Sequence, residues 1–194
     1  MMQFKNWTLS VAAMLLLKCP FVAAGPANRS LGQADGSPKN HDRATARLCR
    51  WEFDLSGVTD NFKRSYLDDL VGEFPRIDDR VAGLNKQAGW IACENPSRPP
   101  VGSFNGLVSY GNGGHRRATY FLPEGDGTSE PVFVPRSMDA HEGDGWLLAV
   151  IWRGNERRSD LAVFEASDIQ HGPIATVELS CRVPYGFHGN WVGA

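Results

Sequence analysis

A histidine stands near the end of the chain, in the stretch RVPYGFHGNW that runs from Arg182 to Trp191. His188 follows an aromatic residue and precedes a glycine, where a strand that only closed a sheet would continue its apolar alternation. A neutral imidazole can bind a transition metal through one ring nitrogen while the other donates a hydrogen bond. His188 is therefore a candidate metal ligand, and the alternative is a core histidine bonded to a backbone carbonyl.

Two glutamates also stand at the border of an apolar run. Glu73 lies in GEFPRIDDR and Glu130 lies in SEPVFVPR. A carboxylate buried at such a place needs hydrogen-bond donors, because burial without a partner is costly. The second ring N–H of a metal-bound histidine is a suitable donor. Glu73 and Glu130 are therefore candidates for carboxylates that orient a histidine ligand.

The other four histidines have sequence surroundings typical of solvated turns. They are His41 in a polar stretch, His115 in a Gly-rich turn, His141 before the turn EGDGW and His171 beside Gly172. None of them borders an apolar strand end as His188 does, so we interpret all four as surface residues.

Short apolar runs with turn residues between them recur from residue 47 onward. These runs are CRWEFDL, FKRSYLDDL, FNGLVSY, RRATYFL, PVFVPR, GWLLAVIW, SDLAVFEA and IATVELS. Their length and composition predict strands, and Asn112-Gly113 together with EGDGW predicts tight hairpin turns. Only ASDIQH, with Asp168 as a possible cap, predicts a helical turn. The sequence therefore predicts an all-β antiparallel meander, which must close on itself or stack as propeller blades to protect its edges.

Two tryptophans in the most apolar of these strands could be read in two ways. Trp146 and Trp152 alternate with Leu148 and Val150 in GWLLAVIW. We interpret them as core residues of the strand and not as a platform for a substrate, because alternation of this kind is typical of a buried strand face.

The beginning of the chain differs from the rest. Residues 1–24 combine Lys5, an apolar run from Leu9 to Leu17 and a small-residue site, which predicts a secretory signal peptide or leader. Residues 25–46 are polar, lack apolar periodicity and predict a disordered linker. The chain is expected to be exported if this leader is a signal peptide, and cytoplasmic otherwise.

Charge and cysteine content exclude some classes of protein. With 20 basic and 22 acidic residues and no basic stripe, the chain has no electrostatic footprint for nucleic acid. Cys49, Cys93 and Cys181 remain once the leader is set aside, and an odd number argues against a disulfide framework. We expect three reduced, partly buried thiols.

Taken together, residues 48–192 resemble the C-terminal part of the carotenoid oxygenases, the family of lignostilbene dioxygenases, apocarotenoid-cleaving enzymes and the retinoid isomerohydrolase. The stretches that carry the resemblance, in the family's order, are RWEFDL, LDDLVGEFPRIDDR, FNGLVSY, SEPVFVPR, EGDGWLLAVIW, SDLAVFEASDIQHGPIATVEL and RVPYGFHGNW. The resemblance implies that residues 47–194 form about three C-terminal blades of a seven-bladed β-propeller.

The family resemblance also implies a metal centre. Members of the family hold Fe(II) on the propeller axis with four histidines, three of which are hydrogen-bonded by glutamates. By resemblance, His188 is the last of these ligands, Glu130 orients His188, and Glu73 orients a ligand that lies upstream in an intact member. The implied reaction is iron-dependent cleavage by O2 of a carbon–carbon double bond in a carotenoid, apocarotenoid or stilbene. No catalytic residue beyond the metal site is implied.

The upstream region departs from the family pattern. An intact member supplies three histidine ligands and its first blades before the region that matches, where this sequence has the predicted leader and linker. We therefore expect a fragment that is inactive alone and self-associates through exposed blade edges. The alternative, from a different class of function, is a non-catalytic secreted β domain that binds an apolar ligand or a partner chain.

Overall fold

The computed structural model describes residues 8–9, 46–54, 62–85, 87–99, 104–184 and 188–193 of the 194-residue chain. The predicted leader, apart from residues 8–9, and the predicted linker, apart from residue 46, lie outside the described residues. Within the described ranges, no helix has the length and apolar character needed to cross a bilayer.

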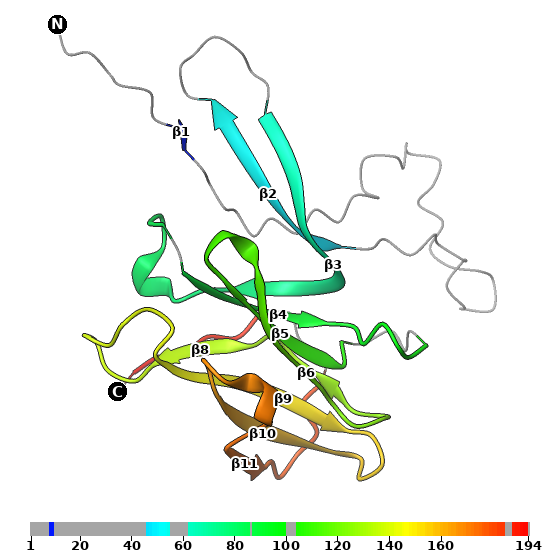
Figure 1. Ribbon diagram of the computed structural model, residues 1–194. Coiled ribbons are helices and arrows are strands. Elements are labelled where there is room, and N and C mark those ends of the chain that lie inside the picture. Colours follow the sequence, from blue (N-terminus) through cyan, green and yellow to red (C-terminus); the bar gives the residue numbers. More distant parts are fainter. Residues whose placement is uncertain are drawn as a thin grey trace, which may run out of the picture.

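Antiparallel strands account for most of the regular structure (Figure 1). The strands are β1 (Thr8–Leu9), β2 (Arg47–Asp54), β3 (Phe62–Arg76), β4 (Ala88–Cys93), β5 (Gly106–Gly111), β6 (Arg116–Phe121), β7 (Gly127–Thr128), β8 (Val132–Pro135), β9 (Gly145–Arg153), β10 (Arg158–Glu165) and β11 (Ala175–Glu178). The helical segments in the described ranges are the short 3-10 turns η2 (Asp79–Val81), η3 (Asn112–Gly114) and η4 (Ile169–His171). The predicted all-β antiparallel fold is confirmed.

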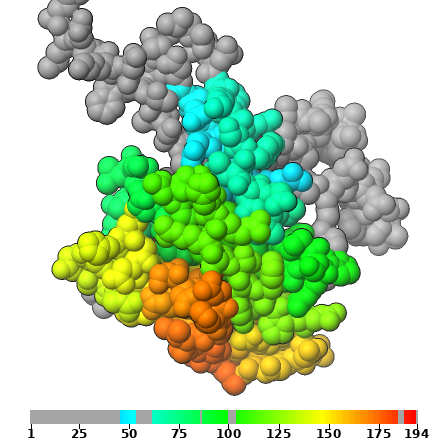
Figure 2. Space-filling model, in the orientation of Figure 1, coloured from blue at the N-terminus to red at the C-terminus, as the bar shows by residue number. Residues whose placement is uncertain are grey.

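The described strands form two sheets, built mainly by pairing of strands that are neighbours along the chain. The first has the order β1-β2-β3-β4-β5-β6, and the second has the order β11-β10-β9-β7 with β8 also paired to β9. Strand β3 is 15 residues long, and it pairs with β2 mainly through its first half and with β4 through its last residues. The β2–β3 hairpin consequently projects from the rest of the molecule, as Figures 1 and 2 show.

The predicted turns fall where the sequence placed them. The β5–β6 connection contains Gly113 and Gly114, with φ angles of 77° and 82°, a backbone conformation that favours glycine. The helical turn predicted at ASDIQH is η4, and Asp168 precedes it. The Asp168 side chain does not cap the turn, because its Oδ2 lies 2.8 Å from Nδ1 of His171.

Among the described residues, the core consists of two apolar clusters on opposite faces of β4 and β5. Trp90 and Leu107 belong to the cluster shared with the second sheet, whereas Ile91 and Val108 face the cluster shared with β2 and β3. The Trp90 ring stacks on Phe133 of β8 with 4.7 Å between ring centroids. Stacking of this kind joins the two sheets, because the rings come from strands of different sheets.

The two tryptophans of β9 do not lie in the core. On this strand Leu147 and Ile151 are fully buried, whereas Trp146 and Trp152 are half-buried on the opposite face. Guanidinium groups lie over both tryptophan rings, with the Arg182 carbon 4.9 Å from the Trp152 centroid. The prediction that these tryptophans are core residues was wrong, because alternation separates two faces of a strand without showing which face is covered.

The described cysteines form no disulfide. Cys49 and Cys93 are buried, and Cys181 is exposed. The burial of Cys49 and Cys93 agrees with the expectation of partly buried thiols.

Candidate functional site

Glu130 and His188 meet although 58 positions separate them in the sequence. Glu130 lies between β7 and β8 and is 6% exposed. Its Oε1 lies 3.2 Å from Nδ1 of His188, and its Oε2 accepts a hydrogen bond of 2.9 Å from the backbone N–H of Gly189. The predicted contact between Glu130 and His188 is therefore confirmed.

This contact determines which ring nitrogen of His188 is available. A carboxylate beside Nδ1 favours the tautomer that carries the proton on Nδ1, so the lone pair is on Nε2. The side chain of His188 is 75% exposed, which leaves Nε2 accessible. When its imidazole is neutral, His188 can therefore offer the Nε2 lone pair to a metal ion.

His188 does not lie in a strand that closes the sheet. The described residues 188–193 have no regular secondary structure. Their position depends on side chains instead, because the backbone of Gly189 bonds to Glu130 and the side chain of Asn190 bonds to Arg76 at 3.1 Å. Because no strand pairing fixes this segment, the direction of the His188 side chain is not limited to the two faces of a sheet.

Arg76 supplies the charge that balances the buried Glu130 carboxylate. Its Nη1 lies 3.7 Å from Oε1 of Glu130, and its side chain is 16% exposed. A buried carboxylate is tolerated when donors and an opposite charge surround it, as His188, Gly189 and Arg76 do here.

A bulge at the end of β3 brings an aromatic ring against the histidine. The pairing of β3 with β4 shifts between Glu73 and Arg76, and Phe74 has a φ of 59°. Its ring meets the His188 ring edge-on at 6.0 Å and the Phe104 ring edge-on at 5.6 Å. A non-glycine residue in this conformation costs about 1–3 kcal/mol and is typical of functional sites. The bulge therefore turns Phe74 toward the site.

Glu73 lies in the same bulge. It is half-buried and pairs with Ala92 of β4. The ligand that Glu73 is predicted to orient would lie upstream of the matching region, so this role stays a prediction.

The described residues do not form a complete metal site. No group of three or more His, Cys, Asp and Glu side chains within the described ranges could hold a metal ion. His171 is exposed and hydrogen-bonded to Asp168. His115 lies between η3 and the first residue of β6, and His141 lies just before the turn that precedes β9. His41 lies outside the described residues. The His188–Glu130 pair has the donor chemistry of an iron ligand, but these residues alone do not complete a ligand set.

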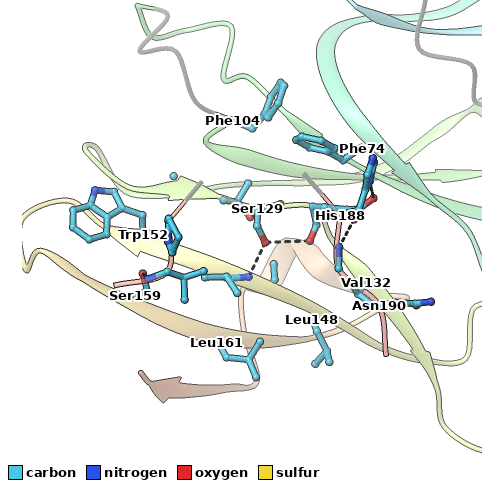
Figure 3. Close-up of a pocket in the computed structure, with 18 of the residues that line it drawn as sticks. Phe74, Phe104, Ser129, Val132, Leu148, Trp152, Ser159, Leu161, His188 and Asn190 are labelled. Carbon is cyan, nitrogen blue, oxygen red and sulfur yellow. Dashed lines mark hydrogen bonds and ion pairs between the residues drawn. The ribbon is translucent and has the colours of Figure 1, made fainter. Parts of the chain in front are cut away.

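A cavity of about 540 Å³ adjoins His188 (Figure 3). Phe74 and Phe104 line one side, and Leu148 and Leu161 of the second sheet line the other. The volume and the mainly apolar lining suit a small apolar molecule. Sequence analysis missed the two phenylalanines, for which the only signal was their place beside Glu73 and at the start of FNGLVSY.

The sequence and the fold of this chain are similar to those of known oxygenases. The family model described as RPE65, retinal pigment epithelial membrane protein, matches residues 14–193. Isoeugenol monooxygenase of Pseudomonas nitroreducens is 36% identical over 166 residues, which are 82% of this chain and 35% of the relative. Apocarotenoid-15,15'-oxygenase of Synechocystis is 44% identical over 141 residues, which are 73% of this chain and 29% of the relative. The crystal structure of Pseudomonas brassicacearum lignostilbene dioxygenase matches with a TM-score of 0.73 and 34% identity over 84% of this chain and 35% of that one.

The fold and the site define a carotenoid-oxygenase-like partial β-propeller. The chain belongs to the RPE65 family. It spans about a third of the length of the relatives that it matches, with 35% of the isoeugenol monooxygenase and 29% of the apocarotenoid oxygenase covered. The family match begins at residue 14, upstream of the range 48–192 on which the resemblance was based.

Proposed function

We propose that this chain is part of an iron-dependent oxygenase that cleaves a carbon–carbon double bond of a conjugated, apolar substrate with O2. The observation that carries the proposal is the 3.2 Å contact between Nδ1 of His188 and the buried carboxylate of Glu130, beside an apolar cavity. A histidine oriented by a carboxylate is the usual arrangement of a metal ligand in proteins.

Each residue of the site has a role that follows from its position. His188 would hold the iron through Nε2, and Glu130 keeps the proton on Nδ1. When bound, iron supplies the activation of O2. Glu73 is proposed to orient a further histidine ligand that the described residues do not include.

The cavity is proposed to bind the substrate. Phe74 and Phe104 offer aromatic edges to a conjugated chain or ring, and Leu148 and Leu161 exclude water from the opposite side. The reaction consumes one O2 for each double bond cleaved, and each of the two alkene carbons becomes a carbonyl carbon. Both oxygen atoms thus end in the two products, with no added reductant.

The relatives leave two substrate classes open. Relatives named for isoeugenol and lignostilbene favour a double bond conjugated to an aromatic ring. The relative named for apocarotenoids has the highest identity of these three, at 44%, and favours a polyene. We therefore propose a carotenoid, apocarotenoid or stilbene as substrate, and the assay must include both types.

The proposal is best tested in a chimera, because this chain spans about a third of its relatives. The matching third of the P. nitroreducens isoeugenol monooxygenase is replaced by this chain, and bound iron and product aldehydes are measured. His188→Ala is expected to abolish both. His171→Ala is the matched control, because His171 is likewise exposed and hydrogen-bonded to a carboxylate. A chimera that retains iron and turnover with His188→Ala would refute the role of His188.

The 194-residue chain is tested in parallel. Because no group of three or more potential metal ligands occurs among the described residues, it is expected to lose Fe(II) on desalting and to take up no oxygen with a stilbene or an apocarotenoid. Saturable binding of a stilbene by the chain, together with an inactive chimera, would favour the alternative of a non-catalytic domain that binds an apolar ligand in the cavity of about 540 Å³.

A further inference from the structure

The segment that carries His188 is held by few contacts. The described residues 188–193 make no backbone–backbone hydrogen bond with the other described residues. Apart from the contacts of the His188 ring with Glu130 and Phe74, two hydrogen bonds between described residues join this segment to the sheets: the backbone N–H of Gly189 donates to Glu130, and the Asn190 side chain accepts from Arg76. The orientation of His188 therefore depends on these side chains and not on a strand register.

Arg76 takes part on both sides of the histidine. Its Nη1 lies 3.7 Å from Oε1 of Glu130, the same oxygen that faces Nδ1 of His188. Its Nη2 donates a hydrogen bond of 3.1 Å to Oδ1 of Asn190, two residues after His188. The same Nη2 lies 3.7 Å from the exposed carboxylate of Asp79. One guanidinium group thus links the carboxylate and the segment that the carboxylate orients.

The shape of the guanidinium matters for this link. Arginine presents several N–H donors in a rigid, planar fork, so two of its nitrogens can contact two acceptors at once. A lysine ammonium at the end of a flexible chain would keep the charge but would not hold both acceptors in one geometry. Asn190 is itself ordered by the bond of 2.9 Å from the Trp191 N–H to its Oδ1.

The bulge in β3 explains why Arg76 can reach this position. The register shift between Glu73 and Arg76 and the φ of 59° at Phe74 change the direction of the strand just before Arg76. The same bulge places the Phe74 ring against His188. The bulge therefore allows two contacts with the histidine segment, that of Phe74 with His188 and that of Arg76 with Asn190.

We infer that Arg76 is a positioning residue that orients His188 by bridging Glu130 and Asn190. That the histidine oriented by Arg76 is a metal ligand rests on the proposed function. The bridge itself does not require metal or substrate. Arg76 acts through Glu130 and Asn190, and it touches no reacting atom.

The test measures the order of the histidine segment in the full 194-residue chain by NMR. Amide hydrogen exchange of Gly189 reports the bond to Glu130, and the ring ¹⁵N shifts of His188 at mildly alkaline pH report its tautomer. Arg76→Ala is expected to speed Gly189 exchange about tenfold, the effect of losing one charged contact. It is also expected to mix the two tautomers. Arg136→Ala is the matched control, because Arg136 is also paired with two carboxylates, Asp144 and Glu165.

Two further variants keep the inference testable if Arg76→Ala does not fold. Arg76→Lys keeps the charge and Asn190→Ala removes only one side of the bridge, and both are expected to speed Gly189 exchange. Exchange and tautomer identical to the wild type in the Arg76 and Asn190 variants would overturn the inference, as would an equal change in Arg136→Ala. Because no metal or substrate is used, this result is independent of whether the chimera is active.

Discussion

Replacing Glu130 by glutamine tests the buried site without changing its shape. The carboxylate accepts two hydrogen bonds, one from Nδ1 of His188 and one from the Gly189 N–H, through different oxygens. A glutamine has one acceptor oxygen and one donor NH₂ group in the same places. If its NH₂ group faces Gly189, one hydrogen bond is lost in Glu130→Gln, and if it faces His188, Nδ1 must give up its proton and accept the hydrogen bond instead.

The expected cost follows from these contacts. A hydrogen bond to a charged group contributes about 1.5–3 kcal/mol and a neutral one about 0.5–1.5 kcal/mol. In either orientation the hydrogen bonds to a charged carboxylate are replaced by fewer or neutral ones. This cost is partly offset because a carboxylate that is only 6% exposed no longer has to be desolvated. We expect Glu130→Gln to lower the free energy of unfolding by about 2 kcal/mol.

Urea denaturation followed by tryptophan fluorescence measures this change. Glu165→Gln is the control, because Glu165 is paired with the exposed Arg136 at the surface. An exposed pair of this kind contributes about 0–1 kcal/mol, so a small effect is expected. A Glu130→Gln chain as stable as the wild type, or a Glu165→Gln chain destabilised as much, would refute the reasoning.

Three further predictions concern the rest of the molecule. Burial alone would raise the pKa of Asp78, but its hydrogen bonds to Arg80 outweigh burial and lower the pKa below its ordinary value of 3.8. The resulting contribution to stability is present above pH 3.8 and is lost as the pH falls through the lowered pKa. In Asp78→Asn, the free energy of unfolding should therefore depend less on pH in this range. A pH dependence equal to that of the wild type would contradict this prediction. Burial raises the pKa of the Cys93 thiol to about 12, so iodoacetamide at neutral pH should label the exposed Cys181 long before Cys93. Peptide mapping measures the two labelling rates, and equal rates would contradict this prediction. The chain should also associate through the half-exposed apolar face of β9 and β10, and a sharp monomer at high concentration in size-exclusion chromatography would count against this.

Some features could be predicted because they depend on local chemistry. Alternation of apolar residues and Gly-containing turns predicted the strands and hairpins, since these patterns act over a few residues. The order of motifs from RWEFDL to RVPYGFHGNW indicated the family, and the match of the family model to residues 14–193 supports it. Glu130 and His188 were paired on the basis of that resemblance, and the 3.2 Å contact confirms the pairing.

Other features required the tertiary structure, because they depend on contacts between residues far apart in the sequence. Trp146 and Trp152 lie on the half-exposed face of β9, since the opposite face packs against the first sheet. His188 lies in an irregular segment held by Glu130 and Arg76, whose contacts with the segment span 58 residues for Glu130 and 114 for Arg76. The sequence by itself determined the strands, the family and the residue types of the site. Only the packing of the two sheets, with the bulge at Phe74, brings Arg76 and the Phe74 ring to the segment that carries His188.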